Sequence, residues 1–122
     1  PVPKGHIWGR TLVRDTELSA PAVANGVAYV ASANGQLHAM SLADGEILWS
    51  YDAGVPIHTS PTVSGSHVFI GTDSGDILGL SVADGILVWQ MRVSAPLQGA
   101  IIMTEDALYA TSREPGVLFA VH

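Results

Sequence analysis

The sequence predicts an all-β protein: a segment of a β-propeller with about three four-stranded antiparallel blades. Three observations predict this fold. The chain repeats itself at an offset of 40 residues, each repeat divides into four short apolar segments separated by turns, and a tryptophan follows the last turn of both complete repeats. A period of about 40 residues with four strands in each period is typical of propeller blades.

The repeat is clearest between residues 41–50, SLADGEILWS, and residues 81–90, SVADGILVWQ. A third copy begins near Ala100 and stops at His122, before its own turn and tryptophan. Residues 4–20 align with residues 44–60, although the N-terminal tryptophan arrives one position early. Pairs of identical residues at an offset of 40 are Pro21 and Pro61, Gly35 and Gly75, Asp44 and Asp84, Gly45 and Gly85, Trp49 and Trp89, and Pro56 and Pro96.

These alignments divide the chain into four parts. They are the outer strand and linker of a split blade (1–18), two complete repeats (19–59 and 60–99) and an incomplete third repeat (100–122). In the second repeat we expect strands at 62–64, 67–72, 76–81 and 87–91, because Val, Ile, Leu and aromatic residues dominate there. Asn-Gly and Asp-Gly pairs supply the turns, and no sustained helical period is present.

The composition limits the classes of function. Hydrophobic residues make up 48% and charged residues 13%, so the chain can bury a core, and its large apolar faces are expected to be covered by more protein. The net charge is −6 and the five basic residues are scattered, which excludes binding to a nucleic acid backbone. The chain contains no cysteine and no apolar run long enough to span a bilayer. Its first residues are not a signal peptide and include no initiator methionine, so it looks like a processed or excised chain.

Residues 39–49 (AMSLADGEILW) and 79–89 (GLSVADGILVW) resemble the tryptophan-docking repeat of quinoprotein-type (PQQ-like) β-propellers. The pattern of that family runs Ala-x-Asp-x-x-Thr-Gly-Lys-x-x-Trp. The resemblance implies that the tryptophan of one blade stacks on the backbone and a small residue of a neighbouring blade, where a flat ring buries a large area. The residues assigned to this docking are Ala39, Gly45, Trp49, Gly79, Gly85, Trp89 and Trp8.

The repeats also depart from the family pattern, so the resemblance is specific for the fold and not for an activity. The same repeat occurs in quinone-dependent alcohol and glucose dehydrogenases, in a lipoprotein of outer-membrane barrel assembly and in sensor domains attached to kinases. The departures are Ser41, Ser81 and His122 at the Asp position, Asp44 and Asp84 at the Thr position, and Glu46 and Ile86 at the Lys position.

About three blades do not close a ring, since members of this family usually have seven or eight. The chain is therefore either a segment of a longer polypeptide or a subunit that closes a ring by self-association. After residues 120–122 (AVH) the repeat needs a short linker and a glycine, which residues 1–5 (PVPKG) nearly supply. A homo-oligomer formed by head-to-tail strand exchange is one expectation, and further blades of the same chain are the other.

The chain offers little that predicts catalysis. Five histidines lack a compact metal-ligand spacing, and we expect structural or surface roles for His6, His38, His58, His67 and His122. The DSGD turn at 73–76 resembles a calcium loop only superficially. Dehydrogenases of this type hold their quinone with a calcium ion, an axial tryptophan and, in several, a vicinal cysteine pair, whereas this chain has no cysteine and uses its tryptophans for docking. We expect no cofactor, no bound metal and no enzyme activity.

The sequence therefore favours a non-catalytic scaffold or recognition surface for a protein, peptide or small ligand. Loops at the faces of a propeller usually form such surfaces. A part of a quinone-dependent dehydrogenase and a purely structural subunit are the alternatives. The family resemblance suggests a periplasmic or extracellular protein, with the cytoplasm left open. The candidate partner surface consists of His58, Arg92, Gln98, Arg113 and Glu114.

Overall fold

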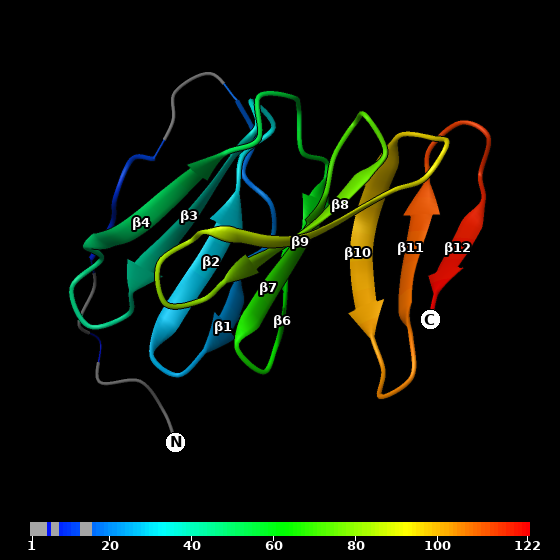
Figure 1. The fold of residues 1–122 in the computed structure, drawn as a ribbon. Helices are drawn as coiled ribbons and strands as arrows, with labels where there is room; N and C mark the ends of the chain where they lie inside the picture. The colour runs from blue at the N-terminus through cyan, green and yellow to red at the C-terminus, as the bar shows by residue number, and fades with distance from the viewer. Residues whose placement is uncertain (1–4, 6–7, 13–15) are drawn as a thin grey trace.

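Three sheets stand side by side in the computed structural model, which describes Gly5, residues 8–12 and residues 16–122 (Figure 1). Twelve strands make up these sheets, and the described residues contain no helix. The prediction of an all-β propeller segment with about three four-stranded blades is confirmed.

Blades 1 and 2 are four-stranded antiparallel sheets in which each strand pairs with the next along the chain. The strands predicted for the second repeat match the observed ones to within one residue. Blade 1 contains β1 (Ala22–Ala24), β2 (Val27–Ala31), β3 (Gln36–Ser41) and β4 (Ile47–Asp52). Blade 2 contains β6 (Thr62–Ser64), β7 (His67–Gly71), β8 (Asp76–Ser81) and β9 (Leu87–Arg92).

Blade 3 has a different fourth strand. It contains β10 (Leu97–Met103), β11 (Leu108–Ser112) and β12 (Leu118–Val121), and β5 (Thr59–Ser60) pairs with β10 in parallel. β5 belongs to the connection between blades 1 and 2, so this connection also adds a strand to the sheet of blade 3. The free edge of β12 has no partner among the described residues, whereas β3 and β8 are paired on both edges.

The split blade predicted for residues 1–18 is only partly described. Residues 8–12 belong to no strand, and Leu18 forms an isolated bridge with Ser32. The described N-terminal residues and β12 lie at opposite ends of the row of blades (Figure 1). Residues 1–4, 6–7 and 13–15 lie outside the described part of the chain, so the outer strand expected there stays a prediction.

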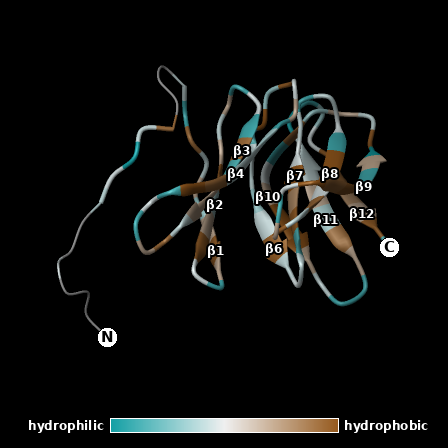
Figure 2. Ribbon diagram, turned by 60° about the vertical axis from the view of Figure 1, so that its left-hand side comes forward, coloured by the Kyte–Doolittle hydropathy of each residue, from teal (hydrophilic) through white to brown (hydrophobic). Residues whose placement is uncertain are grey.

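Two apolar clusters hold the blades together, one at each blade boundary. Val68 and Ile70 of β7 pack toward blade 1, whereas Phe69 of the same strand packs toward blade 3. Blade 2 is therefore buried on both faces, which explains why β7 and β8 are apolar along most of their length. Apolar residues concentrate in the strands and polar ones in many of the connecting turns (Figure 2).

Candidate functional site

Tryptophan side chains join neighbouring blades at one end of the sheets. The indole Nε1 of Trp49 donates a hydrogen bond of 2.9 Å to the carbonyl of Val82 in blade 2. The ring lies against Gly85, which has a φ of +74°, and a Cβ atom there would lie 2.4 Å from Cε3 of Trp49. Only glycine accommodates both this backbone conformation and the close ring. Trp49 thus ties blade 1 to blade 2.

Trp8 makes the same contact with the equivalent turn of blade 1. Its Nε1 donates to the carbonyl of Leu42 over 2.9 Å, and a Cβ atom on Gly45 would lie 2.5 Å from its Cε3. The Trp8 side chain remains 40% exposed. The described N-terminal residues therefore continue the blade-to-blade contact at the outer side of blade 1.

The small residues assigned to docking lie within the same blade as the tryptophan. The strand register places Ala39 opposite Trp49, and Gly79 opposite Trp89. Without a long side chain at position 79, Phe69 makes an edge-to-face contact with Trp89, at a centroid distance of 5.9 Å. The neighbouring blade supplies the turn glycine, and the small residue makes room beside the ring.

An ion cluster lies at the other end of the blades, in the β7–β8 turn. Asp73 Oδ1 accepts a hydrogen bond of 2.6 Å from Arg113 Nη2 in the β11–β12 turn, and His58 Nε2 lies 3.7 Å from the same oxygen. The three side chains come from two blades and the connection between blades 1 and 2. All three are partly solvated, so the cluster contributes little to stability and its charges stay accessible to a partner.

Backbone hydrogen bonds fix the turns that carry this cluster. The amide of Asp73 donates to the carbonyl of Pro56 over 2.9 Å, and the amide of Arg113 donates to that of Pro96 over 3.0 Å. Each turn is thus held by the connection that enters from the preceding blade. Asp73 and Arg113 occupy equivalent repeat positions, 40 residues apart, and face each other across the blade boundary.

A small polar pocket of about 150 Å³ lies beside the cluster and shares His58 with it. Thr59 Oγ1 in this pocket accepts a hydrogen bond from the Gly71 amide and donates one to the Gly71 carbonyl. Ser19 Oγ accepts a hydrogen bond from the Ala31 amide. These hydroxyls therefore stabilise the fold and are not arranged as nucleophiles. The lining residues are Glu17, Leu18, Ser19, Ala33, Ile57, His58, Thr59, Ser60 and Gly99.

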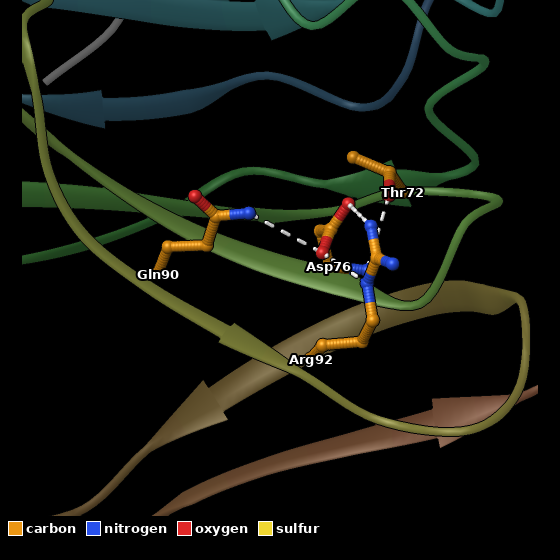
Figure 3. Close-up of polar contacts among 4 residues, drawn as sticks. All are labelled: Thr72, Asp76, Gln90 and Arg92. Atoms are coloured by element: carbon orange, nitrogen blue, oxygen red, sulfur yellow. Dashed lines mark hydrogen bonds and ion pairs between the residues drawn. The ribbon is translucent and has the colours of Figure 1, made fainter.

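Arg92 is engaged with a carboxylate of its own blade. Its Nε and Nη2 donate to the two oxygens of Asp76 at 2.9 and 3.0 Å, and Gln90 Nε2 lies 3.4 Å from Oδ1 (Figure 3). The hydrogen bond from Arg92 holds the pKa of Asp76 below its ordinary value, although burial opposes this shift. The bidentate pair fixes the end of β9 to the start of β8.

The structure brings two of the five predicted partner-surface residues together. His58 and Arg113 meet at Asp73, which the sequence analysis assigned to a turn. Arg92 pairs with Asp76 instead. The Gln98 carbonyl accepts a hydrogen bond from Thr111 Oγ1, and Glu114 is exposed in the β11–β12 turn. The opposite charges at repeat-equivalent positions 73 and 113 were the signal in the sequence that would have pointed to the cluster.

His38 occupies a core position in β3. Its Nδ1 lies 2.7 Å from Ser50 Oγ, while its Nε2 is buried without a hydrogen-bond partner in the described part of the chain. Burial lowers the pKa of His38, so the imidazole is kept neutral. This arrangement stabilises blade 1. His38 does not line the polar pocket beside the Asp73 cluster.

The described residues offer few groups to a quinone with its calcium ion. Within the described ranges, no three His, Asp or Glu side chains gather in a group that could hold a metal ion. The chain has no cysteine to form a vicinal pair, and the indole N–H groups of Trp8 and Trp49 bind backbone carbonyls. Among the residues described, no helix is long and apolar enough to cross a membrane.

Comparison with known proteins identifies the family. A family model described as outer membrane protein assembly factor BamB matches residues 4–121. The chain belongs to this family of PQQ-like propeller proteins. A search of curated protein sequences finds no significant match to the chain.

Solved structures of propellers have the same fold as this BamB-family chain. The computationally designed Ika4 protein gives a TM-score of 0.75 at 15% identity over 87% of this chain and 66% of its own. BamB from Moraxella catarrhalis gives 0.72 at 21% identity, covering 83% and 31%. Quinohemoprotein alcohol dehydrogenase from Comamonas testosteroni gives 0.71 at 20% identity, covering 82% and 18%.

These likenesses show the fold alone, because all three identities are low. The chain spans less than two thirds of the length of each of these structures. The chain is thus a PQQ-like propeller segment of the BamB family that shares its fold with a quinohemoprotein alcohol dehydrogenase. The prediction of that repeat family is confirmed.

Proposed function

We propose that this BamB-family segment is a non-catalytic recognition surface for a protein, and that the surface consists of the Asp73 cluster and the adjoining polar pocket. The observation that carries the proposal is that His58 belongs to both features. A partner that enters the pocket would meet the cluster at the same time. The accessible charges of the cluster would then contribute specificity more than affinity.

The size of the pocket favours a side chain over a cofactor. Small-molecule sites usually measure about 300–1,000 Å³, whereas this pocket measures about 150 Å³. Glu17 and the hydroxyl groups of the lining offer hydrogen-bond acceptors to an incoming group. The best fit is therefore a donor-bearing side chain, such as Lys or Arg, on an extended segment of a protein partner.

The family description supports this proposal and suggests where it acts. It names an outer membrane protein assembly factor, and assembling a protein would require contact with it. We therefore propose a periplasmic protein that binds segments of its protein partners through this surface.

Site-specific photo-crosslinking tests the proposed surface. A photoreactive amino acid replaces His58 in one variant and Ala83, in the exposed β8–β9 turn at the other end of blade 2, in the matched control. We expect cross-links to a protein partner from position 58 and none from position 83. Arg113→Ala should reduce the yield at position 58. Equal yields from both positions, or no cross-link from position 58, would contradict the proposal.

A part of a quinone-dependent dehydrogenase is the second candidate, supported by the fold likeness to the Comamonas testosteroni enzyme. Titration with pyrroloquinoline quinone and calcium distinguishes the two candidates through the tryptophan fluorescence of the chain. The recognition proposal expects no saturable change. Saturable quenching that requires calcium would favour the dehydrogenase candidate.

A further inference from the structure

Arg92 and Arg113 both pair with an aspartate, but the two pairs use their donors differently. Arg92 donates from Nε and Nη2 to both oxygens of Asp76, which is only 9% exposed. Among the described residues, Arg113 donates to Asp73 from Nη2 alone, and only Oδ1 receives that hydrogen bond. A guanidinium group has five N–H donors. The first pair is therefore closed within its blade, whereas the second has hydrogen-bonding groups left for a partner.

The groups left at the second pair are of two complementary kinds. No described residue donates a hydrogen bond to Oδ2 of Asp73. His58 does not engage the carboxylate either, because its Nε2 lies 3.7 Å from Oδ1, which is beyond hydrogen-bond distance. The side chains of Asp73 and Arg113 are 29% and 38% exposed, so an incoming group can reach both. The pair thus offers an acceptor and several donors side by side.

The pair carries no net charge, and this decides which kind of group it fits. A charged group attracted by Asp73 or Arg113 is repelled by the other side chain, whose charged atom lies 2.6 Å away. A neutral amide instead has an N–H donor for the carboxylate and a carbonyl acceptor for the guanidinium. Hydrogen bonds with one charged partner are roughly twice as strong as those between neutral groups. The pair is therefore complementary to an amide.

The main chain of an extended segment presents amide groups in the arrangement that the pair requires. In an antiparallel ladder, every second residue directs both its N–H and its C=O toward the neighbouring strand. Asp73 and Arg113 stand in for the residue on that neighbouring strand, because one accepts from the N–H and the other donates to the C=O. The side chain of Asn or Gln offers the same two groups, so the experiment has to distinguish a main-chain amide from a side-chain amide.

The pair lies close to the polar pocket of the proposed recognition surface. His58 lines the pocket, and its Nε2 is 3.7 Å from Oδ1 of Asp73. An extended chain advances about 3.3 Å per residue. A segment whose cationic side chain enters the pocket, toward Glu17, therefore places a neighbouring residue at Asp73 and Arg113.

Backbone hydrogen bonds hold both side chains of the pair in place before a partner binds. The Asp73 amide donates to the Pro56 carbonyl over 2.9 Å, and the Arg113 amide donates to the Pro96 carbonyl over 3.0 Å. The β7–β8 turn is closed by a further bond of 3.0 Å from the Gly75 amide to the Thr72 carbonyl. Binding therefore requires little ordering of the protein, which favours affinity.

We infer that the pair of Asp73 and Arg113 binds main-chain amide groups of an extended segment, beside the cationic residue that enters the pocket. The inference rests on the proposed function and adds what the surface recognises. Asp73 accepts from an N–H of the segment, and Arg113 donates to a C=O. The side chain of the neighbouring residue takes no part, so segments that differ there bind alike. The partner is an unpaired segment, because N–H and C=O groups already paired in a helix or sheet are not accessible.

NMR titration of the isotope-labelled chain with short peptides tests the inference through the Ser60 and Gly99 amides, which belong to the pocket lining. The reference probe is acetyl-Ala-Ala-Lys-Ala-Ala-amide. An N-methyl group on one of the two residues beside the lysine should weaken binding at least about tenfold, because it removes a donor to a carboxylate. The same group on the last alanine is the matched control. Glutamate or glutamine beside the lysine should change the affinity less than about threefold.

The protein side of the contact is tested by Asp73→Ala, with Asp84→Ala in the exposed β8–β9 turn as the matched control. Asp73→Ala should bind the reference peptide and its N-methylated forms equally weakly, because the acceptor of the N–H is gone. Asp84→Ala should keep the full N-methyl effect of the parent. This coupling between a protein and a peptide change is not expected if Asp73 acts only on the stability of its turn.

The outcomes separate the inference from the proposed function. Binding that needs the lysine, shown by a norleucine peptide that fails to bind, but ignores the N-methyl groups overturns the inference and leaves the proposed function standing. At least about tenfold tighter binding of the glutamate or the glutamine peptide shows a carboxylate or a side-chain amide at Arg113 and overturns it too. Asp73→Ala with an undiminished N-methyl effect, or no binding of any peptide, does the same. Cross-linking from position 58 decides the proposed function separately.

Discussion

Blades 1 and 2 have the same backbone arrangement but different polar side chains at equivalent positions. Their third and fourth strands pair in the same register, with a bulge at the same place. Blade 1 buries His38, whereas blade 2 has Leu78 at that position. Blade 2 buries Asp76 at the start of β8, whereas blade 1 has the half-buried Gln36 at the start of β3.

This difference separates what specifies a blade from what varies within it. The turns, the strand register and the tryptophan-glycine contact are common to both blades, and they depend on backbone geometry and ring packing. The polar pairs, His38 with Ser50 and Asp76 with Arg92, lie along the β3–β4 and β8–β9 pairings. Substitutions in the common features should therefore destabilise the protein most, and substitutions in the polar pairs should mainly change its response to pH.

The largest effect is expected from Gly85→Ala. The new Cβ atom would clash with the ring of Trp49 and would force alanine into a left-handed backbone conformation. Overpacking and backbone strain together are expected to lower the free energy of unfolding by about 2–4 kcal/mol. Urea unfolding followed by tryptophan fluorescence measures the loss.

Substitutions at two further glycines separate the cost of backbone strain from the cost of the clash with an indole ring. Gly54→Ala carries the strain without the clash, and it should cost only about 1–2 kcal/mol. Gly45→Ala should fall between the two, because the ring it displaces, that of Trp8, is 40% exposed. If Gly85→Ala and Gly54→Ala lowered the free energy of unfolding equally, the contact between Trp49 and Gly85 would contribute nothing to the coupling of blades 1 and 2.

A smaller effect is expected from Asp76→Asn in blade 2. The hydrogen bond from Arg92 lowers the pKa of Asp76 in the folded state below the ordinary value of 3.8. The unfolded chain therefore binds this proton first as the pH falls, and the stabilisation present above pH 3.8 is lost below it. The variant should be less stable than the parent at neutral pH, and the gap should narrow in acid.

Arg92→Gln provides the partner measurement for the same pair. It should also flatten the acid part of the stability profile, because it removes the donor that lowers the pKa of Asp76. Urea unfolding between neutral pH and pH 3 compares the three proteins. An acid profile of Asp76→Asn identical to that of the parent would mean that the pair does not stabilise blade 2.

The sequence predicted the common features well, since they depend on local chemistry. The strands at 62–64 and 76–81 lie where alternating or continuous apolar residues meet glycine turns. The repeat offset of 40 residues predicted the number of blades because each blade is one supersecondary unit. The apolar patterns of the strands and the glycine turns each lie within a few residues, so they can be recognised from the sequence.

The sequence predicted the candidate site less well, because its contacts join residues that lie far apart in the sequence. Arg92 was predicted to lie on a partner surface, and the sequence did not show that the strand register places it opposite Asp76. Asp73 was assigned to a turn, and the packing of blade 3 brings Arg113 to it. β10 begins at Leu97, ahead of the predicted boundary, because its first residues pair with the returning end of β11.

The smallest effect at neutral pH is expected from His38→Leu, which gives blade 1 the residue of blade 2. Leu78 shows that the same strand position accepts leucine, so the change in the free energy of unfolding at pH 7 should stay within about 1 kcal/mol. Burial lowers the pKa of His38 in the folded state below 6.5. Below pH 6.5 the unfolded chain therefore binds a proton that the folded chain does not, and acid favours unfolding.

The pH profile rather than the neutral stability thus decides whether His38 acts as an acid-sensitive position. The parent protein should lose stability as the pH falls from 6.5, by at most about 1.4 kcal/mol per pH unit from this one group. His38→Leu should remove that loss, while Leu78→Val in blade 2 should lower stability equally at every pH. Parallel profiles for the parent and His38→Leu would show that the buried imidazole finds its second hydrogen-bond partner when protonated, because only then would its charge carry no penalty.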